Sequence, residues 1–179
     1  MRVKWLILTA FFTAMYIVGA FIKIPMFPVA ITLQSVFVVL SGIILGYKRA
    51  FFAVVSYMVL GLLGLPVFSG GGGVMYVLNP MFGYIIGFVL CAVLVGLMRE
   101  KCKRLTLIKL FIIAFLGHIL IYIVGMTYYM FLIKVYFGTH KDVFSILYSC
   151  VLVFIPGDLV KCIISSFLGK KLIKIIERV

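Results

Sequence analysis

The stretch LFIIAFLGHILIYIVGMTYYMFLI, residues 110–133, runs for 24 residues without one charged side chain. About 20 consecutive apolar residues are enough for an α-helix to cross the hydrocarbon core of a bilayer. Other apolar runs follow one another along the chain, separated by short polar or basic segments. A transmembrane barrel would show short segments of alternating polarity instead. The sequence therefore predicts an all-α membrane protein.

The composition of the whole chain supports this prediction. Of its 179 residues, 66% are hydrophobic and only 12% are charged, more apolar surface than a soluble domain of this size can bury. The net charge is +13, but the basic residues lie between the apolar runs. We therefore interpret them as signals for membrane orientation and expect no nucleic acid partner. Cys91, Cys102, Cys150 and Cys162 form no CxxC pair, and we expect neither a metal ion nor another cofactor.

The apolar runs divide the chain into six predicted transmembrane helices in a single domain. Residues 23–30 contain two prolines, and residues 66–80 contain four consecutive glycines, so neither segment is expected to be helical. A basic turn, Tyr47-Lys48-Arg49, separates the second and third helices. The stretch 142–155 is too short to cross and is predicted to form a short helix at the surface or within the bundle. The predicted transmembrane helices are residues 5–22, 31–46, 50–65, 80–98, 110–133 and 156–176.

The distribution of basic residues predicts the orientation of these helices. With the N-terminus in the cytoplasm, 13 of the 17 Lys and Arg residues fall in cytoplasmic segments and three in outer loops, with Lys161 left within a helix. Cytoplasmic loops of membrane proteins are enriched in Lys and Arg. We therefore expect a multi-pass protein of the bacterial cell membrane with both termini cytoplasmic.

One pair of charged residues lies within an apolar context. Asp158 and Lys161 are three residues apart, so both lie on one face of the helix predicted to begin at Pro156. Charges inside a membrane are energetically expensive and usually mark a functional site. An ion pair that only holds the helix in place is the alternative. Because Asp158 falls in the first helical turn, the free backbone N–H groups of that turn can contribute to the polar floor of a pocket.

The glycine-rich loop, defined as residues 66–80, is the second candidate. Irregular backbone at membrane depth occurs where it is buried in protein or lines a cavity. Polar residues of several outer segments, among them Asn79 and Gln34, are expected near this loop. We therefore interpret it as a lid over a small-molecule site, with a flexible turn carrying two amide caps as the alternative. The four glycines are Gly70, Gly71, Gly72 and Gly73.

Other motifs indicate close packing of helices, and some motifs of enzymes and ATPases are absent from the sequence. Ala10 and Ala14 lie one turn apart on the first helix, and the pairs Gly42/Gly46 and Gly83/Gly87 have the same spacing, which favours close helix approach. The chain contains no nucleotide-binding loop, so an ATP-driven motor has to be another chain. Ser69 and His118 resemble an intramembrane protease only faintly, and we interpret His118 as a packed polar residue. We expect no enzyme activity.

These polar signals coincide with a family resemblance. The matching stretches are PVAITLQ (28–34), GLLGLPVFSGGGG (61–73), NPMFGYIIGF (79–88) and FIPGDLVK (154–161). They keep the order found in the BioY family, the biotin-binding S components of energy-coupling factor (ECF) transporters, which the chain resembles. One departure is NPMFGY, where the family more usually has a PTGGY-like sequence.

The resemblance implies the six-helix S-component fold, high-affinity biotin capture, and partners in the form of a transmembrane T subunit and two cytoplasmic ATPases. Docking to the partner would use Ala10 and Ala14. The biotin site would involve Asp158, Lys161, Asn79 and the loop around Gly70 to Gly73.

The chemistry of biotin suggests how these groups bind it. Asp158 can accept and Lys161 can donate a hydrogen bond to the ureido ring, and Asn79 can do either. The carboxylate of biotin then meets either the glycine-rich backbone N–H groups or Lys161. Two other functions stay open from the residues themselves: a stand-alone secondary transporter for a small organic acid, and a purely structural membrane subunit.

Overall fold

The structure, a computed structural model, describes residues 2–25, 29–102, 104–136 and 146–176. Within these ranges the chain forms six α-helices: α1 (Arg2–Phe21), α2 (Gln34–Leu45), α3 (Tyr47–Leu62), α4 (Phe82–Lys101), α5 (Leu107–Val135) and α7 (Ile155–Ile176). Four short elements complete the described chain: strands β1 (Lys23–Ile24) and β2 (Ile31–Thr32), the 3₁₀ helix η1 (Val74–Leu78) and the π-helix η2 (Tyr148–Leu152).

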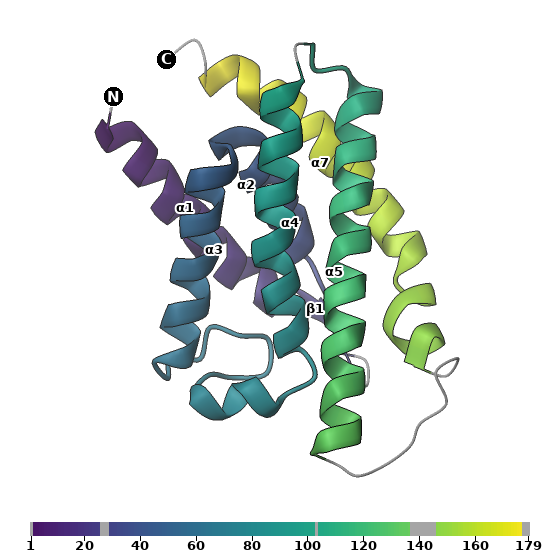
Figure 1. The fold of residues 1–179 in the computed structure, drawn as a ribbon. Coiled ribbons are helices and arrows are strands. Elements are labelled where there is room, and N and C mark those ends of the chain that lie inside the picture. The colour runs from purple at the N-terminus through teal and green to yellow at the C-terminus, as the bar shows by residue number, and fades with distance from the viewer. Residues whose placement is uncertain (1, 26–28, 103, 137–145, 177–179) are drawn as a thin grey trace.

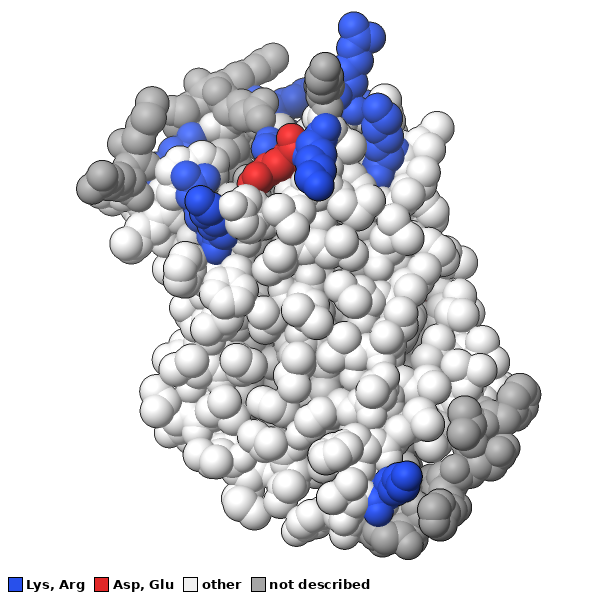
Figure 2. Space-filling model, in the orientation of Figure 1, with Lys and Arg blue, Asp and Glu red and all other residues white. Residues whose placement is uncertain are grey.

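The helices form one elongated bundle with two chemically different ends. Both termini and the α4–α5 connection lie at one end, and strand β1 and the glycine-rich loop lie toward the other (Figure 1). At the first end, Lys4 Nζ donates a hydrogen bond to the carbonyl oxygen of Ile176 at 2.7 Å, which joins the two terminal helices. On the face that Figure 2 shows, most Lys and Arg side chains gather at the end that carries both termini. This is the end predicted to be cytoplasmic.

Helix α2 is the central element of the bundle. All of its twelve residues except Phe37 are buried, which explains why it is apolar around its whole circumference. Helix α4 packs against α2, α3 and α5, and α7 packs against α2 and α5. Glycines allow the closest approaches, as predicted: a Cβ on Gly42 would lie 2.9 Å from the carbonyl oxygen of Ala92, and one on Gly87 would lie 3.0 Å from Ile121 Cα.

The prediction of a basic turn at Tyr47-Lys48-Arg49 is wrong. Gly46 alone turns the chain, with a φ of 74° that side chains other than glycine rarely adopt. Helix α3 therefore begins directly at Tyr47, and the three predicted turn residues form its first turn. Glu100, near the end of α4, accepts a hydrogen bond from the backbone N–H of Tyr47 at 3.3 Å. A carboxylate at this helix start is favourable because the first N–H groups of a helix have no internal partner.

The remaining helix boundaries differ from the predicted ones by a few residues. The second helix begins at Gln34 and not at residue 31, because Ile31 and Thr32 pair with Lys23 and Ile24 in an antiparallel hairpin. The described part of the stretch 142–155 includes η2, and its first residues lie outside the described ranges. The segments Val3–Phe21, Phe82–Lys101 and Leu107–Val135 are long and apolar enough to cross a membrane. Together with α2, α3 and α7 they make up the predicted six-helix architecture.

Candidate functional site

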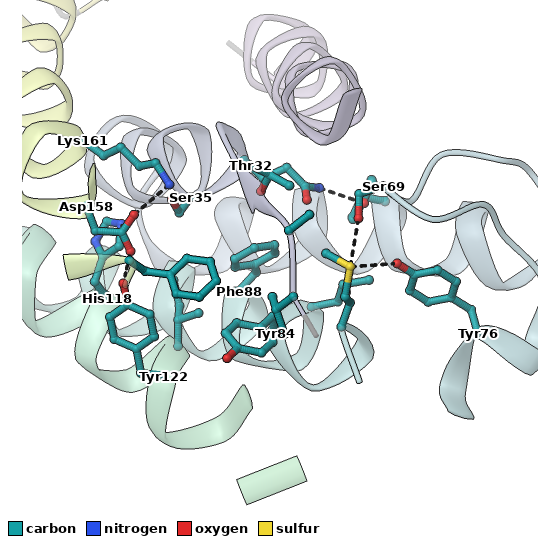
Figure 3. A pocket seen from close by; sticks show the side chains of 18 residues that line it. Thr32, Ser35, Ser69, Tyr76, Tyr84, Phe88, His118, Tyr122, Asp158 and Lys161 are labelled. Atoms are coloured by element: carbon teal, nitrogen blue, oxygen red, sulfur yellow. Dashed lines mark hydrogen bonds and ion pairs between the residues drawn. The ribbon is translucent and has the colours of Figure 1, made fainter. Parts of the chain in front are cut away.

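A cavity lies within the bundle, between the β-hairpin, the glycine-rich loop and five of the helices. Its inner wall comes from α2, α3, α4, α5 and α7, and its outer rim from the hairpin region and the loop (Figure 3). The lining residues are Val29, Ala30, Thr32, Gln34, Ser35, Tyr57, Ser69, Tyr76, Met81, Tyr84, Ile85, Phe88, His118, Ile121, Tyr122, Phe154, Asp158 and Lys161. Aromatic and aliphatic side chains form most of this wall, with polar groups at both ends.

The cavity is narrow in this structure. Its volume is about 50 Å³, whereas pockets that hold drug-sized ligands measure about 300–1,000 Å³. The hairpin region and the glycine-rich loop lie over the cavity, and Val29, Phe68 and Tyr76 of these segments are buried. A drug-sized ligand therefore fits only if segments over the cavity move apart.

The inner end of the cavity holds an ion pair on the first turns of α7. Lys161 Nζ lies 2.7 Å from Oδ1 of Asp158. Tyr122, on α5, donates its hydroxyl proton to Oδ2 of the same carboxylate. Asp158 and Lys161 are 7% and 9% exposed, so both charges are nearly removed from solvent. Pro156 and Gly157 precede Asp158 in the first turn, as the sequence indicates, and the helical spacing brings Lys161 onto the same face.

His118 completes this inner cluster from α5. Its Nδ1 lies 2.9 Å from the carbonyl oxygen of Ala114 and 3.4 Å from Sγ of Cys162. Its Nε2 lies 3.9 Å from Oδ2 of Asp158, too far for a hydrogen bond. The residue is 2% exposed and lines the cavity. Figure 3 shows His118, Tyr122, Asp158 and Lys161 together at one end of the cavity.

The outer end of the cavity is formed by Ser69, Tyr76 and Met81. Both hydroxyl groups donate to the thioether sulfur of Met81, from Ser69 at 3.4 Å and from Tyr76 at 3.9 Å. Burial raises the pKa of the Tyr76 phenol above its ordinary value, so the group stays a protonated donor at neutral pH. Lys23 of β1 donates a hydrogen bond to the carbonyl oxygen of Ser69. This contact joins the hairpin to the glycine-rich loop across the rim.

Gln34 lines the cavity, but its amide nitrogen is already bonded within the protein. Nε2 donates to the hydroxyl of Tyr57 at 2.8 Å and to the carbonyl oxygen of Tyr16 at 3.1 Å. Tyr57 in turn donates to the carbonyl oxygen of Val67 at 3.3 Å. Gln34 therefore connects α1, α2 and α3 with the start of the glycine-rich loop. Its amide oxygen is the atom left for a ligand.

The structure places Asn79 and the four glycines beside the cavity, not among its lining residues. Asn79 Oδ1 accepts a hydrogen bond from the backbone N–H of Met81 at 2.9 Å and shapes the turn into α4. The N–H groups of Gly71 and Gly73 donate to the carbonyl oxygens of Phe68 and Gly61. A Cβ on Gly72 would lie 2.1 Å from the carbonyl oxygen of Leu65. In this structure the loop thus folds onto the end of α3 and positions Ser69 and Met81.

Ala10 and Ala14 do not line the cavity and lie on the exposed side of α1. They form part of a wide groove between α1 and α3 with a volume of about 700 Å³. Its other walls are formed by Thr9, Thr13, Phe52, Ser56 and neighbouring residues. The two alanines keep the floor of this groove open because their side chains end at Cβ. A helix can therefore approach the backbone of α1 closely here.

Sequence analysis missed most of the lining residues. His118, Tyr122 and Ser35 lie in apolar helices where nothing in the local pattern distinguishes a cavity residue from a core residue, whereas Tyr76 lies in the loop that the sequence predicts as a lid. Within the described residues, no three His, Cys, Asp or Glu side chains come together as a group that could hold a metal ion. The inner cluster is instead a set of hydrogen-bond donors and acceptors suited to an organic ligand.

The fold and the cavity define a class of membrane protein. A solved crystal structure of the S-component for biotin from an ECF-type ABC transporter matches this chain with a TM-score of 0.85 and 33% sequence identity. The match covers 97% of this chain and 92% of that chain. The protein therefore has the S-component fold, which confirms the predicted fold class.

A sequence model of the BioY family matches residues 1–178, so the chain belongs to the BioY family. A probable biotin transporter BioY from Lysinibacillus sphaericus is 40% identical over 95% of this chain and 87% of its own length. The biotin transporter BioY from Thermotoga maritima is 36% identical over 98% of this chain and 99% of its own. The resemblance seen in the sequence is confirmed, and the protein is a multi-pass protein of the cell membrane.

Proposed function

We propose that this chain is the high-affinity biotin-binding subunit of an ATP-driven vitamin uptake transporter. The observation that carries the proposal is the buried ion pair of Asp158 and Lys161 in a cavity of a BioY-family protein. A carboxylate accepts hydrogen bonds and an ammonium group donates them. The ureido ring of biotin has two N–H donors and one carbonyl acceptor, so it complements this pair. The aromatic and aliphatic wall suits the thiophane ring and the valeryl chain.

The position of the ion pair orients the ligand. Asp158 and Lys161 lie at the inner end of the cavity, and Ser69 and Tyr76 lie at the outer end. With the ureido ring bound at the inner end, the carboxylate of biotin points toward the rim. There the ammonium group of Lys23, on β1, contacts the backbone of the glycine-rich loop. Lys161 is paired with Asp158, which favours the rim over Lys161 as the site for the carboxylate.

Partner subunits supply the energy in this proposal. The chain carries no nucleotide-binding loop in its sequence, and we infer that a transmembrane T subunit and two cytoplasmic ATPases drive release into the cell. The groove at Ala10 and Ala14 is the surface that we assign to the T subunit, because it admits a helix of another chain. The basic end of the molecule is assigned to the cytoplasm, and the rim of the cavity faces outward. No catalytic step belongs to this chain.

Mass spectrometry of the purified protein tests the ligand directly. We expect biotin to copurify, or to bind in a 1:1 ratio in calorimetry, with lipoate as a comparison ligand that lacks the ureido ring. Binding of lipoate as tightly as biotin would contradict the proposal. Reconstitution in liposomes then separates it from a stand-alone secondary transporter for a small organic acid. Uptake by this chain alone, without ATPase partners, would favour that alternative.

A further inference from the structure

Three buried polar atoms in the cavity have no hydrogen-bond partner among the described residues. They are Nε2 of His118, Oδ1 of Asp158 and Oγ of Ser35, and all three residues line the same cavity. Oδ1 has the ammonium group of Lys161 as an ion-pair partner, but it accepts no hydrogen bond of good geometry. A buried polar atom without a partner is destabilising and requires an explanation. The three atoms therefore mark where a ligand contributes hydrogen bonds.

The contacts of His118 determine which of its nitrogens carries the proton. Nδ1 lies 2.9 Å from the carbonyl oxygen of Ala114, and a carbonyl oxygen only accepts. Nδ1 is therefore the donor, and Nε2 of the neutral ring carries a lone pair. The nearest charged atom, Oδ2 of Asp158 at 3.9 Å, is also an acceptor, and it already takes the hydroxyl proton of Tyr122. Nothing on α5 or α7 thus donates to Nε2.

We propose that His118 Nε2 accepts a hydrogen bond from one ureido N–H of the ligand, while Asp158 Oδ1 accepts one from the other N–H. This inference rests on the proposed function and names a specificity-determining residue of that same site. Two acceptors match the two N–H donors of the ureido ring. The hydroxyl of Ser35 and the ammonium of Lys161 are donors at the same end of the cavity, and they are left for the two lone pairs of the ureido carbonyl.

The sequence interpretation of His118 as a packed polar residue predicts a different result. In that case His118 would join α5 to α7 through Cys162, which lies 3.4 Å from Nδ1. Removing its nitrogens would then weaken the fold and lower affinity for every ligand equally. A residue that contacts one N–H group discriminates between ligands that carry this group and ligands that do not. The two roles are therefore separable by comparing ligands.

Binding of three ligands to purified full-length protein tests the inference. The ligands are biotin and the two analogues in which one ureido N–H is replaced by CH₂, which removes a donor without adding bulk. In His118→Phe, we expect biotin to bind roughly 10-fold more weakly or worse, because one buried N–H loses its acceptor. For one of the two analogues, His118→Phe and wild type should bind with equal affinity. For the other analogue, His118→Phe should bind more weakly by the same factor as for biotin.

Two further variants keep the test decisive if His118→Phe folds poorly. His118→Gln retains a side-chain acceptor at nearly the position of Nε2, and it should bind biotin more tightly than His118→Phe does. Cys162→Ala removes the contact at Nδ1 and should leave all three affinities unchanged. Equal losses for all ligands, or a loss in Cys162→Ala as large as in the His118 variants, would overturn the inference. Unchanged biotin affinity in His118→Phe would overturn it too, and absence of biotin binding in wild type would overturn the proposed function as well.

Discussion

Lys161 Nζ lies 2.7 Å from Oδ1 of Asp158, one helical turn away on α7, and both residues are less than 10% exposed. Separating such a pair leaves one charge without its partner in a medium that solvates it poorly. The pair is held from α5 as well, because Tyr122 donates to the other carboxylate oxygen. Its position at the start of α7 therefore sets the polar end of the cavity.

We predict that Asp158→Asn and Lys161→Ala each weaken biotin binding by about 1–3 kcal/mol or more, because each removes a charged hydrogen-bonding group from a buried site. Calorimetric titration of the folded variants measures this change. Lys171→Ala, an exposed change on the same helix, serves as the control and should bind as wild type. Unchanged affinity in both site variants would assign the pair a structural role.

The stability of the same variants provides a second readout. Breaking a buried ion pair by removing one partner typically costs about 3–5 kcal/mol of stability. The double variant Asp158→Asn/Lys161→Met removes both charges, and we expect it to unfold at a higher temperature than either single variant. Thermal denaturation in detergent measures the unfolding temperatures of the three variants. A double variant less stable than both single variants would mean that the two charges do not stabilise one another.

The membrane orientation can be tested at the two ends of the bundle. Met75, in η1, is 74% exposed, and Lys48, in the first turn of α3, is exposed at the basic end. In a background with Cys102 and Cys150 changed to Ser, we expect Met75→Cys to react with an impermeant thiol reagent in intact cells. Lys48→Cys should react only after the cells are opened. Labelling of both positions in intact cells would contradict the cytoplasmic placement of the termini.

Because the groove between α1 and α3 does not include the cavity, we predict that a change in the groove can abolish uptake and leave biotin binding intact. Replacing Ala10 and Ala14 by Trp fills the floor of the groove, so a partner helix can no longer approach. Uptake in cells should fall strongly, whereas biotin binding by the isolated chain should stay within roughly twofold, because neither alanine lines the cavity. Loss of both would indicate damage to the fold.

The matched control for this pair uses the same helix and spacing. Ile7 and Phe11 are also one turn apart on α1 and exposed, but neither lines the groove. Replacing both by Trp should leave uptake and binding as in wild type. Equal loss of uptake in this control would show that any bulky change on α1 blocks docking, and the groove would not be the docking site.

Lys23 is predicted to slow the release of biotin. Its hydrogen bond to the carbonyl oxygen of Ser69 joins the hairpin to the glycine-rich loop, the two segments that must separate when a ligand passes. Lys23→Ala removes a contact worth about 1 kcal/mol, so we expect dissociation to become roughly fivefold faster. Stopped-flow measurement of the release rate checks this. Lys134→Ala, another exposed Lys outside the cavity, should release biotin at the wild-type rate.

Two glycines provide a matched test of helix packing. A Cβ on Gly87 would lie 3.0 Å from Ile121 Cα and 3.1 Å from its carbonyl oxygen, so α4 and α5 would have to move apart. We expect Gly87→Ala to destabilise the protein by about 1–3 kcal/mol. A Cβ on Gly157 meets nothing within 4 Å, and Gly157→Ala should be neutral or stabilising by up to about 1 kcal/mol. Thermal denaturation of both variants compares them, and equal stability would contradict this account.

The sequence by itself determined the membrane environment, the number of helices and the start of α7. These follow from local properties: the length of apolar runs, the distribution of Lys and Arg, and the preference of Pro156 for a first helical turn. The pairing of Asp158 and Lys161 was also predictable, because residues three apart on a helix share a face. The turn between α2 and α3 was not, because Gly46 has the spacing of a packing residue, and only its φ of 74° shows that it forms the turn.

Only the tertiary structure decided which polar residues meet at the cavity. His118, Ser35 and Tyr122 belong to apolar helices, and each has the local sequence of a core residue. They become site residues because α2, α5 and α7 pack together and bring them beside Asp158. Asn79 lies close in sequence to Met81 and Tyr84, but its side chain turns to the backbone and shapes a turn. Contacts between residues dozens of positions apart leave no periodic signal in a single sequence. These contacts are therefore set by how the helices of the bundle pack.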